Sequence, residues 1–337
     1  MDTADCLINT SLRQILGPMA DARRGFASGS LVRLRRGFYV PVATWREARP
    51  DERFSLALEA HAWANPSAVF CGETALFLRG VPTVKAPATI DVATTSNGRL
   101  GLQPSSFAVR GSSETAILVR RLPPPRIRRR LFARIEAEDA GAFSAVPLAE
   151  ALADVLSTGK FARALTVADA VLRQGGDVAL LDRPDIASAM AALKHQTQRS
   201  RAETVASLAR SGAESPGESV SRALMLLFGF PEPELQREHH DSRGFIGRTD
   251  FAWDGKPSPV GEFDGWGKYF DQELTDGEDP REIIRREKRR ENRLLALGHP
   301  VLRWDWADLE RPVRLRAKLI EAGLRPTERR VVAEKIA

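Results

Sequence analysis

Two short apolar runs that flank a turn constrain the fold of this 337-residue chain more than any other feature. The runs cover residues 249–253 and 260–264, and the segment between them contains Asp254-Gly255. An Asp-Gly pair readily adopts the positive-φ conformation that a tight hairpin needs. The sequence therefore predicts two antiparallel strands here.

Three acidic residues lie on these two predicted strands. Side chains alternate between the faces of a strand, so Glu262 and Asp264 point the same way, and Asp250 on the partner strand comes beside them. Carboxylates this close repel one another unless a cation neutralises them. Oxygen ligands suit Mg²⁺, which proteins bind through carboxylates, water and substrate phosphate. The pattern therefore predicts a phosphodiesterase-like site for Mg²⁺, with Mn²⁺ as an alternative.

The flanking segments extend this hairpin into a larger α/β unit. Ser215 and Glu218 have the spacing of a capping box, and the apolar helix that they begin should end at Gly229. The expected order is therefore α-β-β-β-α-β, with the remaining elements near 235–239, 280–297 and 301–304.

Three stretches of this region carry a family resemblance: Glu262-Phe-Asp264-Gly265 with Lys268, the run 287–294 and the run 297–304. With the element order, they resemble the core of the PD-(D/E)xK nuclease superfamily. Within it they look like the very-short-patch-repair-endonuclease-like domain at the C-termini of actinobacterial proteins. The resemblance covers residues 215–310.

The resemblance implies a role for each acid. Asp250 and Glu262 match the metal ligands of the superfamily, and Asp264 is a further acid of the metal site. Glu218 matches a catalytic acid that faces the site from the first helix. These assignments come from the matched motif.

One position departs from the superfamily pattern and leaves two functions open. The superfamily has a lysine where this chain has Asp264, so Lys268 or Lys288 is the expected catalytic cation. If a lysine reaches the Asp250–Glu262 pair, we expect a Mg²⁺-dependent DNA endonuclease, in which the metal activates a water molecule. The alternative is a non-catalytic DNA-binding antitoxin or transcriptional repressor that keeps only the nuclease fold.

A second hairpin is predicted over residues 31–40, with its turn at Arg36-Gly37. This stretch, SGSLVRLRRGFYVP, resembles the wing of the winged-helix domain in AbiEi-like, type IV antitoxins. A wing presents arginines to DNA, which implies DNA contacts for Arg33, Arg35 and Arg36. The alternative is a small hairpin that only caps the next domain.

A further basic cluster, over residues 281–293, places Arg285 and Arg289 on the predicted charged helix. A basic cluster of this kind either forms a solvated helix face or contacts DNA phosphates. Three glutamates are interleaved with the cluster, so ion pairs within the helix are the alternative.

The fold class predicted for the whole chain is α/β, in three parts. A winged-helix-like segment covers residues 1–48, a mixed α/β region covers 49–210, and an endonuclease-like domain with the PD-(D/E)xK-like core covers 211–337. The middle region is expected to end in one long Ala-rich helix over 184–211. It contains no P-loop, HExxH or GxSxG motif.

Composition narrows the class of protein further. The formal net charge of +6 permits nucleic-acid binding. Cys6 and Cys71 are the only cysteines, which excludes a zinc knuckle or a disulfide framework and fits a reducing cytoplasm. No apolar run of membrane-spanning length occurs, so we expect a cytoplasmic protein without a membrane segment. The expected partners are DNA and a cognate toxin.

Overall fold

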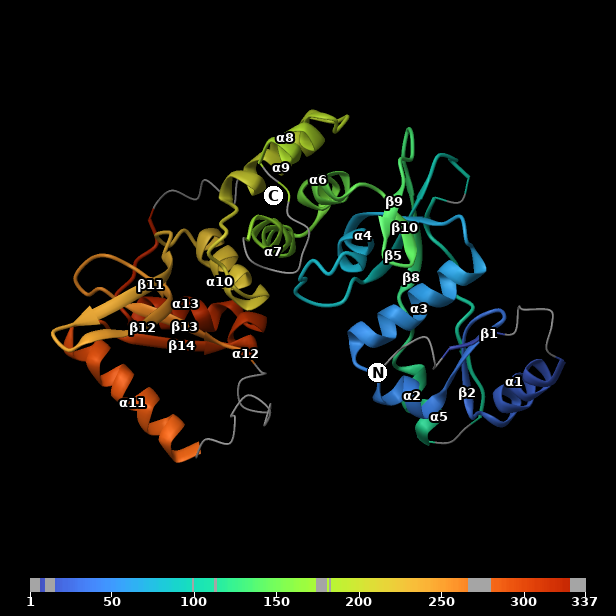
Figure 1. Cartoon of the computed structure of the whole chain (residues 1–337), viewed down its shortest axis with the longest axis horizontal. Helices are drawn as coiled ribbons and strands as arrows, with labels where there is room; N and C mark the ends of the chain where they lie inside the picture. Colours follow the sequence, from blue (N-terminus) through green and yellow to red (C-terminus); the bar gives the residue numbers. More distant parts are fainter. Residues whose placement is uncertain are drawn as a thin grey trace. The chain divides into compact units, whose positions relative to one another are not determined.

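The computed structural model is a mixed α/β structure that describes residues 7–9, 16–98, 100–111, 114–173, 181, 183–265 and 280–327 (Figure 1). The chain divides into two compact units, Met1–Leu152 and Ala153–Ala337, called unit 1 and unit 2 below. Within the described ranges, no helix has both the length and the apolar character needed to cross a membrane.

Unit 1 combines short helices with ten described strands. Its helices are α1 (Leu16–Ser28), α2 (Val42–Glu47), α3 (Pro50–Ala64), α4 (Gly72–Leu78) and α5 (Glu114–Arg120), and α6 (Leu148–Thr158) continues into unit 2. Its strands are β1 (Ile8–Asn9), β2 (Leu31–Arg35), β3 (Phe38–Pro41), β4 (Val69–Phe70), β5 (Thr89–Thr94), β6 (Gly101–Leu102), β7 (Ala108–Val109), β8 (Arg126–Leu131), β9 (Glu138–Ala140) and β10 (Phe143–Ala145).

These strands form two sheets. The smaller sheet has the antiparallel order β1-β3-β2-β7, and the larger has the mixed order β6-β8-β5-β4-β10-β9. The predicted hairpin at 31–40 is confirmed as β2 and β3, with Gly37 at a φ of 88° in the turn. Its inward side chains, including Val32 and Phe38, pack against Trp45 of α2 and Leu56 of α3.

Unit 2 joins a helical part to a four-stranded sheet. Its helices are α7 (Phe161–Leu172), α8 (Arg183–Ala191), α9 (Gln196–Leu208), α10 (Pro216–Leu227), α11 (Pro280–Ala296), α12 (Trp306–Glu310) and α13 (Pro312–Glu321). Its strands are β11 (Glu234–Asp241), β12 (Gly244–Ala252), β13 (Val260–Asp264) and β14 (Val301–Asp305).

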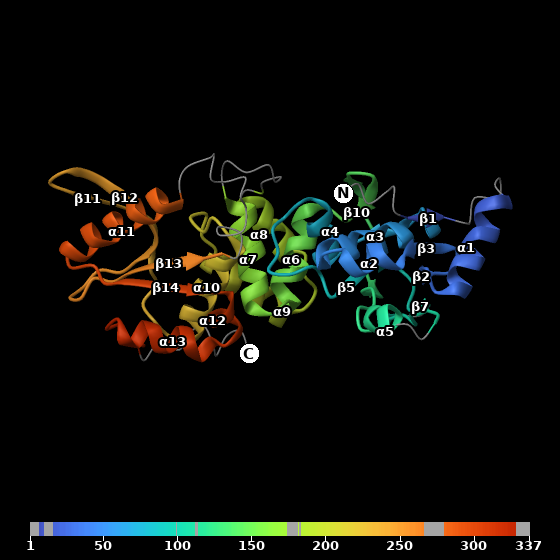
Figure 2. The ribbon, with the colours of Figure 1, turned by 90° about the horizontal axis from the view of Figure 1, so that it is seen from below.

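The expected α-β-β-β-α-β order is confirmed for the described residues as α10-β11-β12-β13-α11-β14. The sheet order is β11-β12-β13-β14, antiparallel except that β14 runs parallel to β13. Helix α11 covers one face of β13 and β14, and α13 lies on the other (Figure 2). Leu294 of α11 packs on Val260, whereas Trp304 donates a hydrogen bond from Nε1 to Ser221 Oγ of α10 at 2.7 Å.

A glycine permits the close approach of α10 to the sheet. A Cβ atom on Gly217 would lie 1.9 Å from the ring of Phe263 on β13, so a larger residue would push the helix away. Helix α10 therefore begins directly beside the strand that carries Glu262 and Asp264.

The prediction of one long helix over 184–211 is wrong. Two helices, α8 and α9, are separated by residues 192–195. The Ala-rich sequence favours helix throughout, but the chain turns after α8, and Arg199 Nη2 of α9 donates to the Leu193 carbonyl at 2.9 Å. This bond satisfies a carbonyl that a continuous helix would have used.

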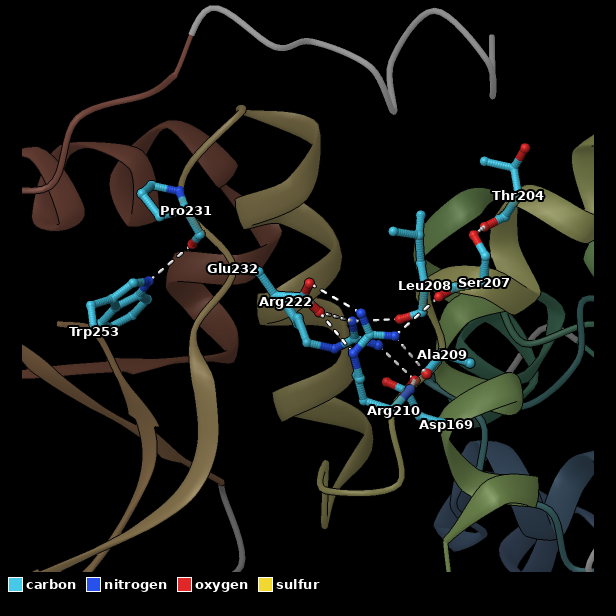
Figure 3. Close-up of polar contacts among 10 residues, drawn as sticks. All are labelled: Asp169, Thr204, Ser207, Leu208, Ala209, Arg210, Arg222, Pro231, Glu232 and Trp253. Carbon is cyan, nitrogen blue, oxygen red and sulfur yellow. Dashed lines mark hydrogen bonds and ion pairs between the residues drawn. The ribbon is translucent and has the colours of Figure 1, made fainter.

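A buried ion pair joins α10 to the helical part of unit 2 (Figure 3). Arg222 Nη2 lies 2.6 Å from Asp169 Oδ1 of α7, and Arg222 Nη1 donates to the Leu208 carbonyl of α9 at 2.7 Å. Both charged side chains are almost completely buried. The boundary expected at residue 211 therefore runs through a packed region, and the division into three parts stays a prediction.

Candidate functional site

Glu218 lies at the start of α10, where Ser215 is confirmed as the N-cap but the expected capping box is incomplete, because Glu214 N rather than Ser215 N donates to Glu218. Ser215 Oγ accepts a hydrogen bond from Glu218 N at 3.2 Å and donates to Glu218 Oε1 at 2.7 Å. Glu218 Oε2 accepts from Glu214 N and from Gln236 Nε2. Burial, and then the nearby Asp250 carboxylate, raise the pKa of Glu218 above its ordinary value.

Gln236 of β11 links Glu218 to Asp250 of β12. Its Nε2 lies 2.9 Å from Glu218 Oε2 and 3.3 Å from Asp250 Oδ1. Its backbone has a φ of 55°, a left-handed conformation that is costly for a residue with a Cβ atom and is often found at functional sites. Gln236 is not among the site residues predicted from the sequence, because no local pattern indicates which residue of this strand comes beside Asp250.

Asp250 is held between β12 and β13. Its Oδ2 accepts a hydrogen bond from Phe263 N at 2.8 Å, next to the last paired residues of these strands, Phe251 and Gly261. Both carboxylate oxygens of Asp250 therefore have hydrogen-bond donors.

Glu262 lies between two arginines. Its Oε1 is 2.5 Å from Arg290 Nη2 of α11, and its Oε2 is 2.9 Å from Arg303 Nη2 of β14. Arg303 is the register partner of Glu262 in the parallel pair of strands, so their side chains share one face of the sheet. A Cβ atom on Gly247 would lie 2.5 Å from Arg290 Nε, so this glycine makes room for the second arginine.

The same arginines reach two further acids. Arg303 Nη1 lies 3.6 Å from Asp264 Oδ1, and Arg303 also contacts Glu287, whose Oε1 is 3.0 Å from Arg290 Nη1. The shared contact with Arg303 confirms that Glu262 and Asp264 face the same way. Burial raises the pKa of Glu287, but hydrogen bonds and charges from Arg303 and Arg290 outweigh it and lower the pKa below its ordinary value.

The carboxylates in this arrangement fit arginine and amide donors rather than a metal ion. In the part of the chain that the structure describes, no three His, Cys, Asp or Glu side chains are grouped closely enough to hold one. Asp250 is bound by Gln236 and Phe263 N, and Glu262 by Arg290 and Arg303. The Mg²⁺ or Mn²⁺ site therefore stays a prediction.

Among the described residues, the cations at Glu262 are arginines and not the expected lysines. Lys268 lies outside the described residues, and Lys288 is exposed on α11. Arg290 and Arg303 contact Glu262 instead. The sequence contained a signal for Arg290, because it stands one helical turn before the apolar Leu294 and therefore shares its buried face.

The two predicted DNA-contacting residues of α11 point outward. Arg285 and Arg289 are both exposed, and Arg285 Nη1 lies 2.6 Å from Glu282 Oε1. The Arg285–Glu282 pair is an ion pair within the helix, which was the alternative to DNA contact. Arg289 forms no ion pair with a described residue.

The three N-terminal arginines occupy different environments. The guanidinium of Arg33 lies 5.1 Å from the ring centre of Phe26, and Arg33 Nε donates to the Ser106 carbonyl. Arg35 is half-buried and donates from Nη1 to His61 Nδ1 at 2.9 Å. Arg36 is exposed at the hairpin turn.

Comparison with known proteins adds little to this geometry. No protein-family model and no curated protein matches the sequence. A solved structure, the RV2827C protein from Mycobacterium tuberculosis, matches with 15% sequence identity over 60% of this chain and 68% of that chain, at a TM-score of 0.34. A similarity this low identifies neither a fold nor a function.

Proposed function

We propose that this protein binds DNA, and that unit 2 is a PD-(D/E)xK-like module that has become a non-catalytic antitoxin or repressor. The observation that supports this best is the position of Arg290 and Arg303 on Glu262, because two fixed guanidinium groups neutralise a carboxylate that a nuclease would use for its metal. The side chain of Glu262 is 11% exposed, so removing these partners would leave a poorly solvated charge.

Helix α11 supports the DNA-binding part of the proposal because its two sides differ. On the inner side, Arg290 contacts Glu262, and Arg293 Nη2 lies 2.6 Å from Asp241 Oδ1. On the outer side, Glu282 is exposed, whereas the partly exposed Glu287 and Glu291 lie beside Arg303. The exposed basic residues are Arg281, Arg285, Arg286, Lys288 and Arg289. This excess of positive charge suits the phosphate backbone of DNA.

Salt-dependent binding to duplex DNA tests this proposal. Replacing Arg285 and Arg289 together with glutamine should flatten the log–log dependence of affinity on salt by about 0.9 for each phosphate that the variant no longer neutralises. The double variant Arg314→Gln with Arg316→Gln, at two exposed positions on α13, is the matched control because it removes the same two charges elsewhere in unit 2. An unchanged slope in the double variant, or an equal change in the control, would contradict DNA binding through α11.

The Mg²⁺-dependent endonuclease expected from the sequence is the second candidate. It is favoured by the acids that gather at one end of the sheet, where Glu218 and Asp250 share Gln236 and repulsion from Asp250 contributes to the raised pKa of Glu218. A metal would have to replace the present partners of Asp250 and Glu262.

Calorimetry with Mg²⁺ and Mn²⁺, followed by incubation with single-stranded and duplex DNA, separates the two candidates. Metal binding with cleavage that Asp250→Asn abolishes would establish the endonuclease and overturn the non-catalytic proposal. DNA binding without cleavage in either metal would support the antitoxin or repressor.

A further inference from the structure

A pocket of about 250 Å³ in unit 1 carries an excess of positive charge. It lies between the end of β2, helix α3 and strand β8, and its lining contains Arg35, Arg36, Arg126 and Arg129. Among the described residues that line it, none is Asp or Glu. Nothing in the proposed DNA-binding function accounts for this concentration of arginines.

Arg35 contributes a donor that lacks an acceptor. Its Nε is buried and has no hydrogen-bond partner, whereas its Nη1 donates to His61 Nδ1. Because Nε is shielded from solvent, a ligand in the pocket can meet only the remaining part of this half-buried side chain.

Alternation along β8 separates its arginines into two groups. Arg128 and Arg130 face Asp91 of β5 and form ion pairs with it. Arg129 points to the opposite face of the sheet, as does Ile127 two residues before it. Arg129, Ile127 and Ile90, which pairs with Ile127 on β5, all line the pocket. Arg129 forms no ion pair with an acidic residue in the described part of the chain.

The other two lining arginines are also without acidic partners among the described residues. Arg126 donates from Nη2 to the Gln103 carbonyl at 3.1 Å, and Arg36 is exposed at the turn between β2 and β3. Cationic groups that line a concave surface reinforce one another's potential. Guanidinium groups also match the oxygens of a phosphate in planar, two-pronged hydrogen bonds.

We propose that this pocket binds a phosphate dianion, either free or as the phosphate group of a small monoester. The phosphate lies among Arg35, Arg36 and Arg129, and the partly exposed apolar side chain of Ile127 contacts the organic part of an ester. The half-buried Arg35 favours a ligand that enters the pocket over a DNA backbone that lies across its mouth.

Calorimetry on the full chain with inorganic phosphate, ribose 5-phosphate and ribose tests this inference. We expect at least one phosphate compound to bind at millimolar concentration or below and ribose not to bind. Tighter binding of ribose 5-phosphate than of inorganic phosphate assigns the pocket to a monoester, and the reverse assigns it to free phosphate.

Two variants locate the site. Arg129→Gln should weaken phosphate binding by about tenfold or more, which corresponds to about 1.4 kcal/mol. Arg134→Gln is the matched control, because Arg134 is 82% exposed and lies outside the pocket lining. Arg129→Lys, which keeps the charge, should retain part of the affinity, and circular dichroism verifies that each variant is folded.

Three results would overturn the inference. The first is that no phosphate compound binds to the wild-type protein. The second is that Arg129→Gln, although folded, binds phosphate as tightly as the wild type. The third is that duplex DNA displaces phosphate and that Arg129→Gln weakens duplex binding equally, which would make the pocket a part of a DNA interface.

Discussion

Four arginines line the pocket of unit 1, with no acidic residue among its described lining, whereas Arg222, Arg290 and Arg303 of unit 2 each contact a carboxylate. A charge removed from water needs a partner of opposite charge or a strong hydrogen-bonding group. Unit 2 supplies that partner from its own sequence, so a cation that binds there has to compete with arginine. Unit 1 leaves its positive charge available to an anionic ligand.

The largest expected effect concerns the buried pair of unit 2. Arg222→Met should lower the free energy of unfolding by about 3–5 kcal/mol, because Asp169 would remain buried without its partner. Urea denaturation measures the loss. The double variant Arg222→Met with Asp169→Leu should recover much of this loss. If Arg222→Met is as stable as the wild type, the buried charges of unit 2 do not depend on their partners.

Arg303→Gln should have a smaller effect on stability, a loss of about 1–3 kcal/mol, because Arg303 is partly exposed and Arg290 still contacts Glu262. The loss of one cation should also make the carboxylates more attractive to Mg²⁺. Thermal unfolding with and without Mg²⁺ should therefore show a larger increase in Tm for this variant than for the wild type. An equal increase in both proteins, or in the control Arg316→Gln, would show that Arg303 does not compete with a cation.

Each unit contains a buried histidine whose pKa can be compared with that of the other. Burial lowers the pKa of both His61 and His239 to about 4, assisted by the charge of Arg35 at His61 and by His299 at His239. Since the unfolded state takes up these protons near pH 6.5, their contribution to stability is complete above that pH and is lost as the pH falls from about 6.5 to about 4.

Phosphate should change the pKa of His61 but not that of His239. A dianion in the pocket of unit 1 offsets the charges of Arg35, Arg36, Arg126 and Arg129 around His61, so its pKa should rise while that of His239 stays the same. NMR titration of the imidazole ring protons, with and without phosphate, measures both. Equal shifts at the two histidines would indicate a general salt effect.

The smallest expected effect completes the comparison. Arg129→Gln should change the free energy of unfolding by less than about 0.5 kcal/mol, because the substitution breaks no ion pair with a described residue. Urea denaturation under the conditions used for Arg222→Met gives the direct contrast. A decrease of several kcal/mol in the free energy of unfolding would show that Arg129 has a structural role and that its charge is not available to a ligand.

Local sequence patterns determined much of the secondary structure of unit 2. The N-cap signal of Ser215 placed the start of α10, and alternation along 260–264 placed Glu262 and Asp264 on one face. Both signals depend on residues within a few positions of one another, so they can be recognised without knowledge of the fold.

Tertiary structure alone decided which charges meet. Arg303 reaches Glu262 because β14 pairs with β13 in one particular register, and Gln236 reaches both Glu218 and Asp250 because three elements converge there. Likewise, the pocket of unit 1 brings together arginines from β2 and β8, nearly a hundred residues apart. The energy of a charge depends on its partners and its exposure to water, and both are created only when distant segments pack together.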